Sequence, residues 1–304
     1  MKRFILCWLG GSLLLSACVT SHVAGPEKLR IVTTFYPLTY IMQRIGGNDI
    51  DVMQIVPAGI EPHEYEPTPH DVAMIEYAHA LLLNGNGIDA WAEKFMTQFI
   101  QEEKQVIRAV DCCNDLSKRL PEETIDPNDP HTWLDPVLMS AMAIHIRGAL
   151  RSSAYISAQE HLVMDKRLEL LTQDLTILDE EYKKQLSRCA LHDIVTAHDA
   201  FGYAGKRYGF TVHSIAGLSP EEEPSPKQMA DLTDLIKKLG IDTVFFESLT
   251  SPKLAETIAQ ETGVKTAVLN PIEGLTNEDR LAGKDYLSLM RDNLAALRGA
   301  LHCP

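Results

Sequence analysis

The sequence predicts an α/β protein of two lobes with parallel sheets, joined by one long rigid helix. Two observations indicate the lobes. Short apolar runs alternate with helical stretches over residues 29–156, and the same alternation returns over residues 189–304. Such alternation is typical of βα units, whose strands pair in parallel. The third observation is the intervening segment 157–188, which contains no Gly and no Pro and therefore favours an uninterrupted helix.

The first lobe contains four predicted strands and four predicted helices. The strands cover residues 30–34, 51–56, 80–84 and 106–109, and the helices cover residues 38–45, 69–78, 88–100 and 136–150. Thr68 followed by Pro69 is typical of a helix start, because threonine caps the first turn and proline suits its first position. Pro136 predicts the start of the fourth helix in the same way.

The second lobe repeats the alternation without a recognisable sequence repeat. Its predicted strands cover residues 193–197, 211–215, 243–247 and 265–269, and its helices cover residues 201–208, 226–239, 252–262 and 284–300. We therefore expect a second parallel sheet.

The segment between the lobes carries one apolar stripe. Its apolar residues recur every three or four positions, at Met164, Leu168, Leu171, Leu175, Leu178, Tyr182 and Leu186. This spacing places them on one face of a helix. A helix of about 30 residues spans roughly 45 Å, enough to run along both lobes. The alternative from the pattern alone is an ordinary amphipathic helix inside one domain.

The N-terminus has the features of a bacterial lipoprotein signal. Lys2 and Arg3 precede an apolar stretch over residues 4–16, which is too short to span a bilayer as a helix. The stretch leads into Leu-Ser-Ala-Cys, which resembles a lipobox with Cys18 as the lipidated residue. We expect a signal peptide over residues 1–17 and a tether over residues 18–28. The mature protein would then lie outside the cytoplasm, in the periplasm or at the cell surface, attached to the membrane only by its lipid; an ordinary signal peptide with a chance cysteine is the alternative.

Apart from Cys7 and Cys18, four cysteines remain, at positions 112, 113, 189 and 303. Cysteines of exported proteins meet an oxidising compartment, so one disulfide is expected. Cys189 and Cys303 are one candidate pair, but sequence alone leaves the connectivity open.

Several function classes receive no support. With 42 acidic and 28 basic residues, the net charge is −14, which argues against binding a nucleic-acid backbone. The sequence contains no P-loop, no GxSxG elbow and no GxGxxG fingerprint. His63-Glu64 begins like the HExxH motif of zinc proteases, but the second histidine is missing and Pro67 would break the helix.

Four candidate metal ligands are each predicted to follow a strand, two in each lobe. His63 and His131 lie in proline-bracketed loops, His198 lies between a strand and a helix, and Glu273 follows the last strand. Ligands of open α/β sheets gather at the carboxyl ends of strands, so we expect these side chains in a cleft between the lobes. Three imidazoles and one carboxylate suit tetrahedral Zn²⁺, whereas Mn²⁺ prefers more oxygen ligands.

These segments carry a family resemblance. GIEPHEYEPTPHDV, DPHTWLDP, VTAHDAFGYAGKRYG and LNPIEGLT resemble the metal-binding lipoproteins of bacterial zinc and manganese ABC importers, and the resemblance covers nearly the whole chain. It implies two α/β lobes joined by one long helix, with His63, His131, His198 and Glu273 as ligands. Manganese-type members have a carboxylate at the position of His198, so the resemblance favours the zinc-type branch. It further implies that the protein delivers Zn²⁺ to an ABC permease and its ATPase without being an enzyme, and we expect a monomer.

Some alternatives stay open at this point. Glu61, Asp279, Asp285 or a water could replace Glu273 as the fourth ligand. A manganese-binding counterpart, a secreted zinc hydrolase and an adhesin-like surface role are the alternative functions. The segment 117–129 contains no histidine, unlike the His-rich loop of many zinc-type members. Seven further histidines are expected to be surface or packed residues: His70, His79, His145, His161, His192, His213 and His302.

Overall fold

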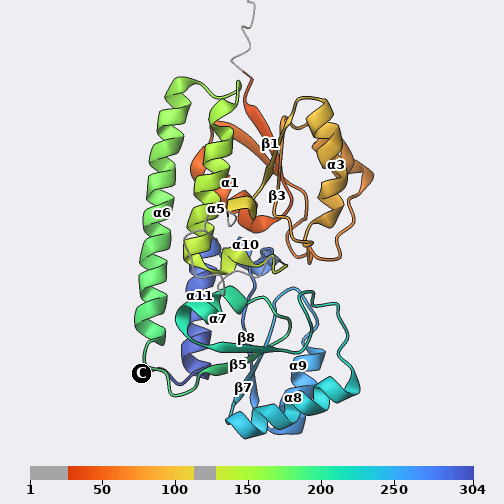
Figure 1. Ribbon diagram of the computed structural model, residues 1–304, viewed down its shortest axis with the longest axis vertical. Helices are drawn as coiled ribbons and strands as arrows, with labels where there is room; N and C mark the ends of the chain where they lie inside the picture. Colours follow the sequence, from red (N-terminus) through yellow and green to blue (C-terminus); the bar gives the residue numbers. More distant parts are fainter. Residues whose placement is uncertain (1–26, 113–127) are drawn as a thin grey trace, which may run out of the picture.

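The computed structural model describes residues 27–112 and 128–304. These residues form two α/β lobes, one above the other, and a long helix runs along one side of both (Figure 1). This is the predicted fold class. The signal segment, Cys18, the first part of the tether and Cys113 lie outside the described residues.

The N-terminal lobe contains one four-stranded parallel sheet in the order β2-β1-β3-β4. Its strands are β1 (Leu29–Thr33), β2 (Ile50–Gln54), β3 (Ala80–Leu83) and β4 (Gln105–Arg108). Its α-helices are α1 (Tyr36–Gly46), α2 (Pro69–Tyr77), α3 (Ala90–Gln101) and α5 (Pro136–Ala149), with short 3₁₀ helices η2 (Thr132–Leu134) and η3 (Leu150–Ser152). Strand β3 is buried along its whole length, as expected for a parallel strand covered on both faces.

The C-terminal lobe repeats this architecture in the order β6-β5-β7-β8. Its strands are β5 (Asp193–Thr196), β6 (Thr211–Ser214), β7 (Thr243–Phe246) and β8 (Lys265–Val268). Its helices are α7 (Gly202–Tyr208), α8 (Pro226–Leu239), α9 (Lys253–Thr262), α10 (Asn277–Leu281) and α11 (Tyr286–Ala300). In both sheets the first strand of the lobe pairs with the second strand on one side and with the third strand on the other. The lobes therefore share one topology, although their sequences show no repeat.

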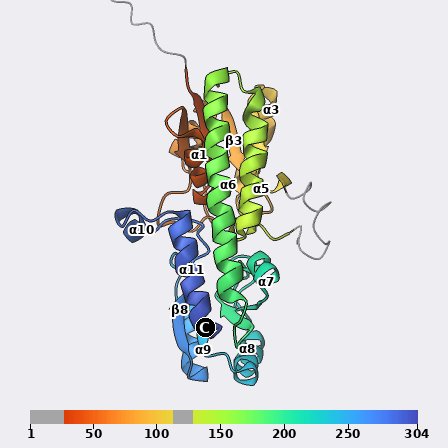
Figure 2. The ribbon, with the colours of Figure 1, turned by 90° about the vertical axis from the view of Figure 1, so that its left-hand side faces the viewer.

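The predicted long helix is α6 (Ala158–Leu186), which has 29 residues. Ser157 and Glu160 form a capping box that satisfies the free N–H groups of its first turn. The helix packs against α1 and α5 of one lobe and against α7 and α11 of the other (Figure 2). Six of the seven predicted stripe residues are buried, and Leu168 is partly buried against the same core. The helix therefore belongs to both lobes, and the alternative of a helix inside one domain is wrong.

The apolar core is continuous across the two lobes. One cluster includes residues of the first sheet, the inner face of α6 and the inner face of α11. A second, smaller cluster lies in the C-terminal lobe, where α8 and α9 cover the sheet. Shared packing of this kind restricts the movement of one lobe relative to the other, since packed cores resist continuous deformation.

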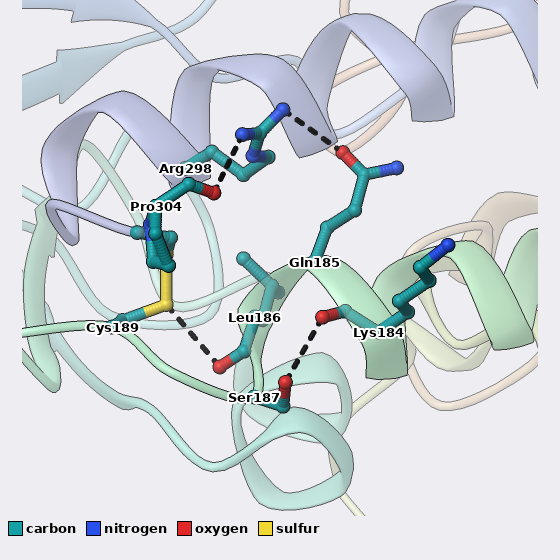
Figure 3. Close-up of a disulfide and its surroundings, with 8 residues drawn as sticks. Lys184, Gln185, Leu186, Ser187, Cys189, Arg298 and Pro304 are labelled. Atoms are coloured by element: carbon teal, nitrogen blue, oxygen red, sulfur yellow. Dashed lines mark hydrogen bonds between the residues drawn. A yellow bond between two sulfur atoms is a disulfide. The ribbon is translucent and has the colours of Figure 1, made fainter.

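A disulfide joins Cys189, just after α6, to Cys303 near the C-terminus (Figure 3). Arg298 lies beside it and donates hydrogen bonds to the side-chain oxygen of Gln185 and to the carbonyl of Pro304. The end of the chain is thus attached to the end of the long helix.

Within residues 27–112 and 128–304, no helix is both long and apolar enough to cross a membrane.

Candidate metal centre

The four predicted site residues come together between the lobes. His63 lies in the loop after β2, and His131 directly precedes η2, both in the N-terminal lobe. His198 follows β5 and Glu273 follows β8 in the C-terminal lobe. One ligand atom from each of the four lies within 4.8 Å of the others. The site thus uses the carboxyl ends of strands in two different sheets.

The loop that carries His63 is held by its own hydrogen bonds. The carboxylate of Glu61 accepts the backbone N–H of His63 at 3.1 Å and that of Glu64 at 3.4 Å. Gly59 adopts a left-handed conformation with φ of 84° and donates its N–H across the lobes to the carbonyl of Leu275. These contacts position His63 relative to the opposite lobe.

The donor atoms are arranged around one point. Oε1 of Glu273 lies 3.4 Å from Nε2 of His63, 3.5 Å from Nε2 of His131 and 3.4 Å from Nε2 of His198. The Nε2 atoms of His131 and His198 are 3.1 Å apart. A tetrahedral zinc ion with bonds of about 2.0–2.1 Å separates its ligand atoms by about 3.4 Å. These four distances, 3.1–3.5 Å, therefore fit one tetrahedral ion.

Burial adds a second indication. The side chains of His131, His198 and Glu273 are at most 1% exposed, and that of His63 is 8% exposed. Nε2 of His63 and Oε1 of Glu273 are buried and have no hydrogen-bond partner within residues 27–112 and 128–304. Unpaired buried polar atoms cost free energy, and a bound cation would satisfy both of them. His63, the least buried of the four, marks the side nearest to solvent.

Two of the candidate ligand imidazoles are each held by a carboxylate in the same way. Asp129 accepts both the backbone N–H of His131, at 2.9 Å, and a hydrogen bond from its Nδ1, at 2.8 Å. Glu247 accepts the backbone N–H of His198 at 3.1 Å and a hydrogen bond from its Nδ1 at 2.6 Å. A carboxylate on Nδ1 places the ring hydrogen there and leaves the lone pair of Nε2 for a metal.

The charges of the site favour cation binding. Burial alone lowers the pKa of His198, but the carboxylates of Glu247 and Glu273 outweigh it and raise that pKa to about 10. Burial likewise opposes the charge of Glu273, yet the three imidazoles 3.4–3.5 Å from its Oε1 hold its pKa well below the usual value. Glu273 is thus a carboxylate at neutral pH and is available as an anionic ligand.

The other candidate carboxylates have different roles in the structure. Asp279 belongs to the capping box of α10, and Asp285 caps α11. Burial and the negative charge of Glu273 together raise the pKa of Glu61 to about 8. Glu61 supports the His63 loop through its hydrogen bonds but is not one of the four clustered residues.

Sequence reasoning missed Asp129 and Glu247. Asp129 lies two residues before His131, and Glu247 follows β7 at the same sheet edge as His198, so a search for acids at strand ends would have found Glu247. Arg207 of α7 forms an ion pair with Asp135 across the lobes. The histidines expected outside the site, such as His79 and His213, are absent from the cluster and contact other side chains.

Comparison with known proteins places the chain in a family. Residues 31–300 match the family model described as zinc-uptake complex component A, periplasmic. The chain is 33% identical over 311 residues to the high-affinity zinc uptake system protein ZnuA of Bacillus subtilis, and the match covers 95% of this chain and 94% of that protein. It is 36% identical over 296 residues to the zinc-binding lipoprotein AdcA of Streptococcus pneumoniae, covering 94% of this chain but only 58% of that protein.

Solved structures agree with this assignment. The Zn(II)-bound ZnuA-like domain of Streptococcus pneumoniae AdcA superposes with a TM-score of 0.75 at 36% identity, covering 90% of this chain and 99% of that one. The laminin-binding protein Lmb of Streptococcus agalactiae, described as having adhesin and metal-transporting activity, gives a TM-score of 0.77 at 32% identity with the same coverage. The chain therefore belongs to the zinc-uptake complex component A family.

Proposed function

We propose that this chain is an extracytoplasmic zinc-binding lipoprotein that captures Zn²⁺ and delivers it to the permease of an ABC importer. The observation that carries the proposal is the buried group of His63, His131, His198 and Glu273, whose atoms are spaced for one tetrahedral ion. ZnuA of Bacillus subtilis, which is similar over almost its full length, is a zinc-uptake protein. Zn²⁺ is the cargo in this proposal.

The site supports a carrier more than a hydrolase. Catalytic zinc usually has three protein ligands and keeps one position open for water. Here a fourth protein group, Glu273, lies within 3.4–3.5 Å of all three imidazole nitrogens and is 1% exposed. Four protein ligands close the coordination sphere and leave no position for a reacting water.

The ligand set also favours zinc over manganese. Three of the four proposed ligands are imidazoles, and Glu247 holds His198 with its Nε2 toward the other ligands. Mn²⁺ prefers oxygen-rich sites of higher coordination number, so a His₃Glu tetrahedron suits it poorly.

Attachment and organisation complete the proposal. Residues 1–17 would be removed, Cys18 would be lipidated and residues 18–28 would serve as a tether. The mature protein would work as a monomer, with an N-terminal lobe over residues 29–156, a linker helix over residues 157–188 and a C-terminal lobe over residues 189–304. The permease and its ATPase are the partners that this role requires.

Calorimetric titration of the metal-free protein tests the function. We expect one Zn²⁺ per chain with high affinity, and much weaker binding of Mn²⁺ in competition. His131→Ala should sharply weaken zinc binding, whereas His213→Ala, outside the site, should not. Equal affinity for the two ions, or unchanged affinity in His131→Ala, would overturn the assignment.

Anomalous diffraction from a zinc-loaded crystal separates the carrier from the hydrolase. We expect four protein–metal bonds and no metal-bound water. Three protein bonds and one water would support the hydrolase instead.

Growth under zinc chelation tests delivery: a strain lacking this gene should grow poorly and recover with added Zn²⁺.

A further inference from the structure

One residue of the N-terminal ligand loop is attached to the C-terminal lobe at two points. Trp133 lies two residues after His131, on η2, and is fully buried. Its indole Nε1 donates a hydrogen bond to the carbonyl of Pro271 at 2.8 Å. Its own carbonyl accepts a hydrogen bond from the hydroxyl of Tyr286 at 2.5 Å. Both partners belong to the opposite lobe, so Trp133 links the two lobes beside the metal site.

The Pro271 end of this link lies in the loop that carries Glu273. Within that loop, Ile272 has φ of 58°, a left-handed conformation that is unfavourable for a β-branched residue. Its N–H is held by the side-chain oxygen of Asn270 at 2.8 Å. Asn293 of α11 in turn accepts the N–H of Asn270 and donates to its carbonyl. A strained segment persists only when its surroundings hold it, so the position of Glu273 depends on these contacts.

We propose that Trp133 is a positioning residue that sets the separation of His131 from Glu273 and thereby controls how long Zn²⁺ stays in the site. This inference rests on the proposed function. The link to Pro271 joins the loop of one ligand to the loop of the other, across 138 residues of sequence. Loss of the indole N–H leaves the Pro271 carbonyl without its donor and allows the Ile272 segment to relax. Glu273 then moves relative to His131, and zinc dissociates faster. Release of zinc by separation of the lobes must likewise break this hydrogen bond.

The chain offers a matched control in Trp91 on α3. Trp91 is 8% exposed, but its Nε1 is buried without a hydrogen-bond partner among the described residues. Tryptophan-to-phenylalanine changes at positions 91 and 133 therefore make the same chemical change. Only the change at position 133 removes an interlobe hydrogen bond.

Zinc dissociation into an excess chelator, followed by stopped flow, tests the inference. We expect Trp133→Phe to release zinc about tenfold faster than the wild type, in the range typical of groups that orient metal ligands. Trp91→Phe should release zinc at the wild-type rate. The absorption spectrum of bound Co²⁺, used as a probe of coordination geometry, should change in Trp133→Phe alone.

A second variant covers the case in which Trp133→Phe folds poorly. Tyr286→Phe removes only a hydroxyl, and we expect it to accelerate zinc release in the same direction. Wild-type release rates and Co²⁺ spectra in both variants, or equal acceleration in Trp91→Phe, would overturn the inference while leaving the proposed function intact. A wild-type protein that binds no zinc would overturn the proposed function instead.

Discussion

At the scale of single residues, the site depends on groups that do not contact the ion. His131 and His198 each donate from Nδ1 to a buried carboxylate, so both rings are oriented before any metal arrives. The same pair of contacts, from the backbone N–H and from Nδ1, occurs in each lobe. A site assembled from four distant loops avoids part of the entropy cost of binding when its ligands are already in place.

Glu247→Gln tests this orientation. Glutamine keeps the size of the side chain but removes the negative charge beside Nδ1 of His198. Zinc affinity should fall about ten- to a hundredfold, as is typical when such a partner is changed. Glu256→Gln, an exposed position on α9, is the control and should leave affinity unchanged. Equal affinities of the two variants by calorimetry would assign Glu247 a purely structural role.

The raised pKa of His198 predicts proton release on zinc binding. Burial lowers that pKa, but Glu247 and Glu273 raise it to about 10. In the metal-free site the ring of His198 therefore carries a proton on both nitrogens at neutral pH. Zinc must displace the proton on Nε2, and binding therefore strengthens as pH rises and weakens about tenfold per pH unit for each proton as pH falls. Calorimetry at pH 7.5 in buffers of different ionisation enthalpy should show at least one proton released per Zn²⁺. A heat that is independent of the buffer would contradict this prediction.

The residues also show how far sequence reasoning reaches. His63, His131, His198 and Glu273 were chosen because each is predicted to follow a strand and parallel strands end at one sheet edge, and the structure brings their side chains together. The directions of side chains are not visible in a sequence. The sequence therefore does not distinguish Glu247 from the other 41 acidic residues, whereas the structure shows its carboxylate against Nδ1 of His198.

At the scale of elements, the length of a helix determined whether the sequence could predict it. All eight strands were anticipated to within about two residues, because short apolar runs bounded by turns are a strong signal. Helix α10 and the 3₁₀ helices η2 and η3 were missed, since elements of three to five residues are too short to show a period. The Trp133–Pro271 contact starts from one of these missed elements, and no local pattern predicts a pair 138 residues apart.

Two adjacent residues of helix α6, one buried and one exposed, test whether the apolar stripe faces the core. Leu178 is fully buried, whereas Ile177 is 50% exposed. Leu178→Ala should lower the free energy of unfolding by about 2–5 kcal/mol, because it leaves a cavity in the core shared by the lobes. Ile177→Ala should change it by less than about 0.5 kcal/mol. Urea unfolding measures both, and equal losses would show that the stripe does not face the core.

At the scale of the whole molecule, the two lobes share one strand order without a sequence repeat. Each sheet places its third strand on the far side of its first, and each lobe contributes two of the four candidate ligands. Topology of this kind follows from the order and packing of elements rather than from residue identity, so it was visible as an alternation but not as a repeat. The long helix then brings the two edges to face each other.

The disulfide should stabilise this arrangement from the end opposite the site. Cys189 and Cys303 are 114 residues apart in sequence, and closing so long a loop restricts the unfolded chain by about 4–5 kcal/mol in the chain-entropy model. The double variant Cys189→Ser, Cys303→Ser should lose stability on this order in urea, with zinc affinity close to that of the wild type. Cys112→Ser, at a buried cysteine outside this disulfide, is the control. A double variant as stable as the wild type would assign the disulfide no stabilising role.

Bound zinc should stabilise both lobes together against unfolding. In the proposed function the ion binds the folded protein through two residues of each lobe, so it should stabilise the native state by about 4 kcal/mol when free Zn²⁺ exceeds the dissociation constant a thousandfold. Because the core is also continuous, we expect calorimetry to show one unfolding transition that moves as a whole to higher temperature with Zn²⁺ and returns with a chelator. In His198→Ala the shift should largely disappear, since the C-terminal lobe then contributes only Glu273. A transition that splits in two on zinc binding, with only one part shifted, would show that the ion is held by a single lobe.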